Sequence, residues 1–196
     1  MRIYLARHAQ EDIKTGKITE LGRRQSRALA QFLSRKDIQA LYSSDLIRAL
    51  ETAKIVGKKL DLATEVSPLL REISTSSPGD WTKYIKERHP DLDFLVGGKE
   101  SLHMVMKRGK QVLEEIIHRN EGKNTAVIAH GIFIKALLYA LGYQEYLMKN
   151  AHVANTGVTI FKYKSDEVRL VEFNHYGHLF PLRVRESLEK VFRPSG

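Results

Sequence analysis

Residues 2–9 read Arg-Ile-Tyr-Leu-Ala-Arg-His-Ala, and residues 126–131 read Ala-Val-Ile-Ala-His-Gly. In each stretch a short apolar run, typical of a buried strand, leads directly into a histidine. Ligands of open α/β sheets bind in the crevice beyond the carboxyl ends of the strands. We therefore expect the imidazole rings of His8 and His130 to meet in one pocket.

Strand and helix patterns alternate along the chain. Strands are predicted at residues 2–6, 38–43, 63–67 and 125–129, and a hairpin at 156–163 and 168–173. Helices are predicted at 20–35 after the N-cap Thr19, from Ser44 or Asp45 through Val56, from Ser101 onward, and from Gly131 to a stop at Gly142. This order predicts an α/β fold: three α/β/α layers around a mostly parallel central sheet, with an antiparallel hairpin at one edge.

Length and composition favour one domain over residues 1–196, because 196 residues with 42% hydrophobic content suit a single core. The weaker pattern between about residues 74 and 100 predicts a small helical cap or insertion, and residues 183–193 a short helix. The absence of cysteine excludes disulfides and thiolate chemistry, and favours a cytoplasmic protein. The apolar runs are too short to span a bilayer, so no membrane partner is expected.

The net charge of +9 admits two explanations, a nucleic-acid partner or basic side chains around an anion pocket. No basic stripe interleaved with aromatic residues and no zinc-finger spacing occurs, so nucleic acid is not the expected partner. His175 and His178 are close enough in sequence to share a metal, but no third ligand stands beside them, and no metal or other cofactor is expected.

A pocket that unites Arg7, His8, Arg48 and His130 is a cationic cup suited to a phosphate ester. Guanidinium groups bind phosphate oxygens bidentately, and helix starts add N–H donors. Nearby cations disfavour an imidazolium, so His8 is expected to stay neutral and to act as a nucleophile on phosphorus. The leaving alkoxide needs a proton, for which Glu72 is the candidate donor because it follows a predicted strand end. Arginines and His130 replace the charge of a metal in this scheme.

Six motifs in family order identify the chain as similar to the histidine phosphatase, or phosphoglycerate mutase-like, superfamily. They are Arg7-His8-Ala9, Ile18-Thr19-Glu20-Leu21-Gly22, Ser43 through Ala53 with Arg48 and Thr52, Leu70-Arg71-Glu72-Ile73, Gly97 through Ser101, and Ala129-His130-Gly131. The resemblance implies a phosphohistidine on His8, a phosphate pocket of Arg7, Arg48 and His130, and Glu72 as proton donor. Gln10 and Gly131, beside the two histidines, are expected to join Arg7, Arg48 and His130 in binding the substrate.

Two departures from the family pattern bear on the substrate. Ala9 replaces the usual glycine, and the chain between His8 and Thr19 is shorter than in typical members. A more open mouth favours hydrolysis over mutase chemistry, which needs closing loops. The expected function is a metal-independent phosphatase for a small phosphorylated substrate or a phosphoprotein. The alternatives are a phosphoglycerate mutase, a phosphohistidine protein phosphatase and a binding module without turnover. Oligomeric state stays open, a homodimer included.

Overall fold

The computed structural model describes residues 1–77, 79–87, 91–149 and 151–181. Its core is a six-stranded sheet in the order β3-β2-β4-β1-β5-β6. The strands are β1 Arg2–Arg7, β2 Ile38–Ser43, β3 Thr64–Val66, β4 Asn124–Ala129, β5 Val158–Lys164 and β6 Glu167–His175. Strands β1 to β4 pair in parallel, whereas β5 runs antiparallel to β1 and forms the edge hairpin with β6. The predicted sheet with its antiparallel edge is confirmed.

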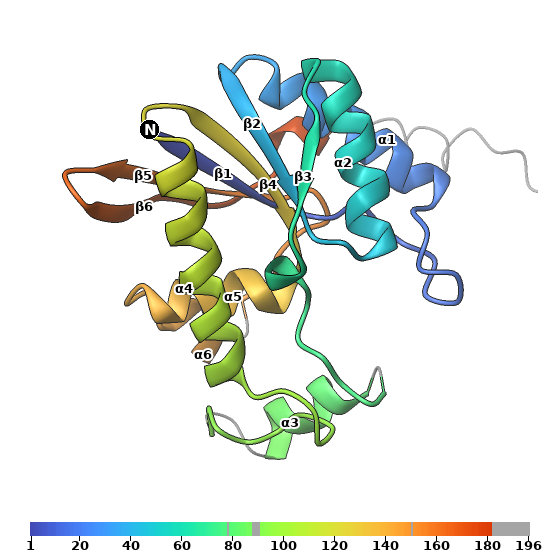
Figure 1. Ribbon diagram of the computed structural model, residues 1–196. Coiled ribbons are helices and arrows are strands. Elements are labelled where there is room, and N and C mark those ends of the chain that lie inside the picture. The colour runs from blue at the N-terminus through green and yellow to red at the C-terminus, as the bar shows by residue number, and fades with distance from the viewer. Residues whose placement is uncertain (78, 88–90, 150, 182–196) are drawn as a thin grey trace, which may run out of the picture.

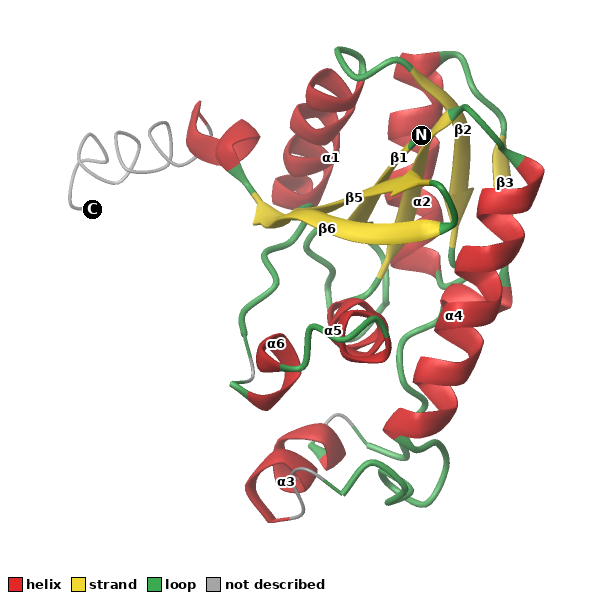
Figure 2. Ribbon diagram, turned by 90° about the vertical axis from the view of Figure 1, so that its left-hand side faces the viewer, coloured by secondary structure: helices red, strands yellow, loops and turns green. Residues whose placement is uncertain are grey.

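Helices cover both faces of this sheet. They are α1 Glu20–Leu33, α2 Ile47–Leu60, α3 Asp80–Glu87, α4 Leu102–Arg119, α5 Gly131–Ala140 and α6 Glu145–Met148. Figures 1 and 2 show α1 and α2 on one face, α4 and α5 on the other, and α3 set apart beyond α5. None of the described helices combines the length and the apolar content needed to cross a bilayer. The three-layer α/β/α arrangement agrees with the prediction.

The side chains of β1 alternate between two separate hydrophobic cores, one on each face of the sheet. Ile3 and Leu5 belong to the cluster under α4 and α5, while Tyr4 and Ala6 belong to the cluster under α1 and α2. Successive side chains of a strand point to opposite faces, so one buried strand serves both layers. Strands β1 and β4 are neighbours with Arg7 opposite Ala129. The two histidines that follow these residues therefore leave the sheet side by side.

Helix α1 begins where the sequence predicts, and its first turn holds the loop after β1. The Oγ1 of Thr19 accepts the Gly22 N–H at 3.0 Å. A Cβ at position 22 would lie 2.3 Å from the Gln10 carbonyl oxygen. Glycine is thus required there because the loop backbone approaches the helix too closely for any side chain.

Several element ends differ from the prediction. Helix α2 starts at Ile47 with Leu46 as N-cap, because the Asp45 carboxylate pairs with Arg71 and the Ser44 hydroxyl accepts from Leu46. Helix α1 ends at Leu33, and β5 starts at Val158 instead of Thr156. The predicted stop at Gly142 fits: α5 ends at Ala140, and Gly142 has φ of +93°. The helix predicted at 183–193 lies outside the described residues.

Candidate active site

His8 and His130 meet at the carboxyl ends of β1 and β4. Their ring centroids lie 5.1 Å apart, and the His8 backbone N–H donates to the Ala129 carbonyl at 2.9 Å. His8 is 2% exposed and His130 is 0% exposed. The structure therefore brings the two sequence-predicted histidines together in a buried position, with His130 also serving as the N-cap of α5.

Hydrogen bonds fix the tautomer of His8. Its Nδ1 lies 2.8 Å from the carbonyl oxygen of Ala9, and its Nε2 lies 3.1 Å from the Nε of Arg48. A carbonyl oxygen only accepts and a guanidinium only donates, so Nδ1 carries the proton and Nε2 carries the lone pair. Nε2 of His8 therefore presents its lone pair toward Arg48.

Thr52 joins Arg48 to the loop that carries His8. Its hydroxyl donates to the Arg48 carbonyl at 2.7 Å and accepts the Ala9 N–H at 3.0 Å. Residues four apart on a helix share a face, so Thr52 lies beneath Arg48 on α2. The sequence analysis quoted Thr52 within a motif but gave it no role.

The guanidinium of Arg7 has one nitrogen with a hydrogen bond to the backbone and one buried nitrogen without a partner among the described residues. Its Nη1 donates to the Val153 carbonyl at 2.7 Å, while its buried Nε has no hydrogen-bond partner in the described part of the chain. Burial lowers the pKa of Arg7, yet a guanidinium starts so high that it remains a cation. Gly131 faces this side chain, since a Cβ at Gly131 would lie 3.7 Å from Arg7 Nε.

His130 is a neutral ring without hydrogen bonds. Burial holds the pKa of His130 well below its usual value, and the neighbouring His8 ring and the guanidinium groups of Arg48, Arg108 and Arg7 act in the same direction. Neither Nδ1 nor Nε2 of His130 has a partner among the described residues. An uncharged imidazole beside fixed cations can donate to, or accept from, a bound oxyanion that carries some protons.

Glu72 is fastened to the start of the helix that His130 caps. Its Oε1 accepts the N–H groups of Ile73 at 3.2 Å and Phe133 at 2.9 Å, and its Oε2 accepts that of Ile132 at 3.1 Å. The structure therefore places the sequence-predicted carboxylate at the N-terminus of α5, against the N–H groups that follow His130 in the chain.

Arg108 of α4 holds the segment that carries Glu72. Its Nη1 donates to the carbonyls of Leu69 and Arg71, each at 2.7 Å, and its Nη2 donates to that of Glu72 at 3.3 Å. An ion pair with Glu100 at 2.8 Å orients the guanidinium. Sequence reasoning missed Arg108, because nothing in its helical pattern distinguishes it from a surface arginine.

Gln10, predicted to bind substrate, lies at the exposed edge of the site. Its Oε1 accepts from the Thr19 hydroxyl at 2.8 Å, and its backbone N–H donates to Gln25 at 2.9 Å. Asn155, which the sequence analysis did not identify, supports the other side by donating from Nδ2 to the His8 carbonyl at 3.2 Å. The loop after β1 is thus held from two directions.

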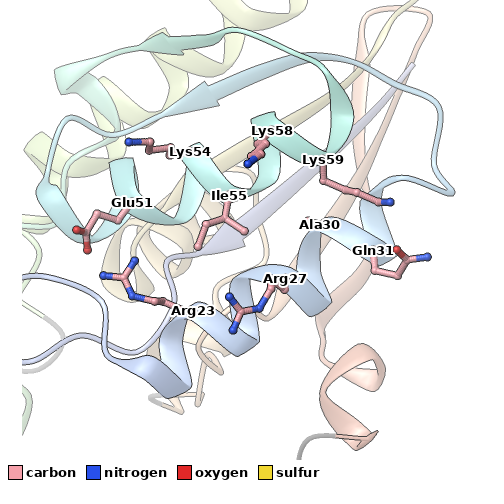
Figure 3. A pocket seen from close by; sticks show the side chains of 9 residues that line it. All are labelled: Arg23, Arg27, Ala30, Gln31, Glu51, Lys54, Ile55, Lys58 and Lys59. Carbon is pink, nitrogen blue, oxygen red and sulfur yellow. The ribbon is translucent and has the colours of Figure 1, made fainter.

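Two cavities compete for the role of substrate pocket. One of about 670 Å³ opens beside the site and is lined by Arg48, Glu72, Arg71, Ser74, Lys99 and Arg108 among others. The other, of about 720 Å³, lies between α1 and α2 and is lined by Arg23, Arg27, Ala30, Gln31, Glu51, Lys54, Ile55, Lys58 and Lys59 (Figure 3). Only the first contains residues from the cluster around His8 and Glu72, so we take it as the candidate substrate pocket.

The remaining histidine pair has a packing role. His175 contacts Glu172 at 2.7 Å, and both His175 and His178 stack on Phe32. Among the residues that the structure describes, no group of three or more His, Asp or Glu side chains is arranged to hold a metal ion. Two other basic side chains of the segment between α3 and α4, Arg88 and His89, lie outside the described residues.

Comparisons with known proteins agree on one family. The chain is 30% identical over 199 residues to the putative phosphoserine phosphatase 2 of Hydrogenobacter thermophilus, covering 90% of this chain and 97% of that protein. Its fold is similar to that of a phosphoserine phosphatase mutant from Entamoeba histolytica in complex with phosphoserine, with a TM-score of 0.77, 23% identity and coverage of 91% and 99%. A mycobacterial glucosyl-3-phosphoglycerate phosphatase structure with VO3 gives a TM-score of 0.76 at 24% identity, with coverage of 89% and 99%.

The sequence profile of one superfamily spans the elements that build the site. It matches residues 3–176, from the first residues of β1 to the end of the β5-β6 hairpin. The matched range contains His8, Arg48, Glu72 and His130, and it leaves out only two residues before it and the C-terminal segment after it. With this match over most of its length, the chain belongs to the histidine phosphatase superfamily (branch 1).

Proposed function

We propose that the protein is a metal-independent phosphatase that hydrolyses phosphate monoesters through a phosphohistidine formed on His8. The observation that carries the proposal is a group of buried side-chain nitrogens that have no hydrogen-bond partner among the residues the structure describes: Arg7 Nε and both ring nitrogens of His130. Each such group left unsatisfied costs about 1–3 kcal/mol. A phosphate group with several oxygens offers partners to these atoms and to Arg48 together.

In the first step, Nε2 of His8 attacks phosphorus in line with the ester oxygen. The P–N bond forms while the P–O bond breaks, and negative charge spreads over the three equatorial oxygens. Arg7 and Arg48 stabilise that charge without reorganising during the reaction. The leaving alkoxide takes a proton from the carboxyl group of Glu72.

In the second step, Glu72 acts as the base. It removes a proton from a water molecule whose oxygen attacks phosphorus, the P–N bond breaks, and His8 returns to its neutral form with the proton on Nδ1. Orthophosphate then leaves. The N–H groups of Ile132 and Phe133 that donate to Glu72 stabilise the ionised carboxylate from which this step begins.

We propose small phosphorylated molecules that also carry a carboxylate as the substrate class. The proteins compared above are named for phosphoserine and glucosyl-3-phosphoglycerate, which share this feature. In the candidate substrate pocket, Arg71 is committed to Asp45 and Arg108 to Glu100, whereas Lys99 is exposed and has no ion pair within the described part of the chain. Lys99 is the cation available to a second anionic group.

The same pocket supports the interpretation of residues 74–100 as a cap on one domain formed by residues 1–196. Ser74 and Lys99 come from that segment, whereas Arg48 comes from α2 and Arg108 from α4. A pocket lined by both parts suits a substrate that the cap covers while His8, at the carboxyl end of β1, attacks it from the other side.

The test compares the protein with its His8→Ala variant, using phosphoserine and para-nitrophenyl phosphate in the presence of a chelator. We expect hydrolysis by the parent protein and a loss of about 10³-fold or more in the variant. Undiminished turnover in His8→Ala would refute the assignment. A panel of phosphorylated metabolites and a phosphohistidine peptide then identifies the substrate, and primed phosphoryl transfer on 3-phosphoglycerate without release of orthophosphate would assign a mutase instead.

Lys99→Gln tests the substrate class, with Lys58→Gln as the matched control. Lys58 lines the groove between α1 and α2 and not the candidate substrate pocket (Figure 3). We expect Lys99→Gln to raise the KM for phosphoserine by about tenfold with little effect on para-nitrophenyl phosphate, and Lys58→Gln to change neither. Equal effects on both esters would exclude Lys99 as the carboxylate partner.

A further inference from the structure

Glu11 is an acidic side chain inside a site otherwise built for an anion. It lies in the loop between β1 and α1, where residue 11 forms an isolated antiparallel bridge with Ile18. The Ile18 N–H donates to Glu51 at 2.7 Å, and the Asp12 carboxylate closes the turn by accepting the N–H of Lys14 at 2.8 Å. These contacts fix the backbone at Glu11, so the position of its side chain is set by the fold of the loop.

The carboxylate of Glu11 lies against both His8 and Arg48. Its Oε2 lies 3.0 Å from Nδ1 of His8, and its Oε1 lies 4.0 Å from Nε of Arg48. The Glu11 side chain is 23% exposed, and Oε2 itself is buried without a hydrogen bond in good geometry to any described residue, His8 included. Nδ1 of His8 is hydrogen-bonded to the Ala9 carbonyl, and the charge of Glu11 lies within ion-pair distance of the same nitrogen.

Groups at the end of β1 and on α2 decide the protonation state of Glu11. Burial alone would raise the pKa of Glu11, but the contact with His8 and the positive charges of Arg48 and Arg7 bring it below its usual value. Glu11 is thus ionised at neutral pH. A carboxylate at this place repels a phosphate dianion, so a site selected only for tight phosphate binding would not contain it.

We infer that Glu11 is a positioning residue that holds the Nδ1 proton of His8 and speeds breakdown of the phosphohistidine, while weakening the binding of orthophosphate. The inference rests on the proposed function. When Nε2 carries the phosphoryl group, cleavage of the P–N bond releases neutral imidazole only if Nδ1 is protonated; otherwise it must release imidazolate, a poor leaving group. Arg48 and the neutral His130 ring contact the same histidine, and the positive charge of Arg7 acts on both Glu11 and His130.

The balance of charge explains why a carboxylate belongs there. Phosphohistidine with a protonated Nδ1 is an imidazolium, which the guanidinium groups of Arg7 and Arg48 disfavour. Glu11 offsets them on the Nδ1 side, as a carboxylate stabilises the imidazolium of a catalytic histidine in general acid–base sites. Its charge also assists departure of orthophosphate, the product of the second step.

The experiment uses the full chain and its Glu11→Gln variant, which keeps the size and removes the charge. We measure the inhibition constant of orthophosphate, the decay of the phosphoenzyme after an alkaline quench, and the pH–rate profile. We expect the inhibition constant to fall by about tenfold, since one unit charge is removed near the anion. Decay of the phosphoenzyme is expected to slow by about tenfold or more, with the alkaline limb of the profile moved to lower pH.

Two further variants separate charge from contact. Glu11→Asp keeps the charge but withdraws it by one methylene, so its orthophosphate inhibition constant should stay near that of the parent while phosphoenzyme decay slows. Glu114→Gln removes an exposed carboxylate of α4 that does not line the candidate substrate pocket, and it should alter none of the three readouts. If Glu11→Gln proves unstable, the test rests on Glu11→Asp: slower phosphoenzyme decay with an unchanged orthophosphate inhibition constant supports the inference, and unchanged values of both contradict it.

Unchanged orthophosphate inhibition and phosphoenzyme decay in Glu11→Gln would overturn the inference while leaving the proposed function standing. A parent protein that forms no phosphoenzyme, and that keeps its activity after His8→Ala, would instead remove the proposed function and this inference with it. The two failures are distinguishable because the first appears only in the Glu11 variants and the second already in the parent protein.

Discussion

Arg48 donates its Nε–H to Nε2 of His8 across 3.1 Å, so a cation already occupies the lone pair that the proposed reaction uses. An arriving phosphate group offers this guanidinium stronger, charged acceptors. Exchange of Arg48 from His8 to a phosphate oxygen would free the nucleophile at the moment when substrate is bound. We therefore expect this contact to couple substrate binding to activation of His8.

Arg48→Lys tests this coupling because lysine keeps the charge and loses the planar, two-pronged donor geometry. We expect kcat/KM for phosphoserine to fall by about 10²–10³-fold. Steady-state kinetics provide the measurement, and Arg27→Lys provides the control, because Arg27 is an exposed arginine of α1 that pairs with Glu20 and lines the groove between α1 and α2. An Arg48→Lys variant as active as the parent would show that a point charge suffices at this position.

Glu72→Gln is expected to act according to the leaving group. An alkyl alkoxide needs a proton, whereas para-nitrophenolate leaves without one, so the variant should lose about 10²–10³-fold on phosphoserine and far less on para-nitrophenyl phosphate. Comparing the two esters in one protein makes the second substrate the internal control. Equal losses on both would place Glu72 outside the proton transfer of the first step.

The sheet and the histidine pair were predictable because strong local signals agree with one topological rule. Apolar runs at 2–6 and 125–129 identify strands, and His8 and His130 stand where ligands bind in open sheets. The structure pairs β1 with β4 and sets the two rings 5.1 Å apart, in agreement with the expected common pocket. Neither apolar run on its own indicates that these two strands are neighbours. Patterns with a period of two or 3.6 residues identify elements, not their neighbours.

Supporting residues escaped prediction because their roles arise only from tertiary contacts. Asn155 reaches the His8 carbonyl across 147 positions of sequence. Arg108 contacts the Glu72 segment from a helix whose exposed face contains other basic residues. Glu11 lies in the shortened loop, where the turn closed by Asp12 decides which carboxylate points inward. No local spacing distinguishes these residues from solvated ones.

Thr52→Val tests the link between α2 and the loop of His8. Valine has the same shape but removes the hydroxyl, which leaves the N–H of the buried Ala9 without its partner. We expect a loss of about 1–3 kcal/mol in the free energy of unfolding, and a lower kcat because Arg48 and His8 lose their common support. Urea denaturation and steady-state kinetics measure both effects. Thr52→Ser, which retains the hydroxyl, should stay close to the parent.

His178 should make the stability of the protein depend on pH. It stacks on Phe32 with ring centroids 5.4 Å apart, and its Nε2 lies 3.3 Å from the Thr156 hydroxyl. Burial, aided by the nearby His175, lowers the pKa of His178 to about 4. Thr156 in turn donates its backbone N–H to the carbonyls of Arg7 and His8, so His178 packs close to the support of the active site.

The direction of this pH dependence follows from how many protons His178 binds in the folded and in the unfolded state. In the unfolded chain histidine titrates near its usual pKa of about 6.5, so between about pH 6.5 and 4 the unfolded state takes up a proton that the folded state refuses. This contribution to stability is complete above about pH 6.5 and is lost as the pH falls toward 4, by on the order of 3 kcal/mol. His178→Phe removes the titration and keeps the stacking on Phe32. Urea denaturation between about pH 6.5 and 4 should show that the free energy of unfolding depends less on pH in His178→Phe than in the parent. The control His118→Gln changes an exposed histidine of α4 and should behave like the parent. The same pH dependence in all three proteins would mean that burial of His178 does not carry the effect.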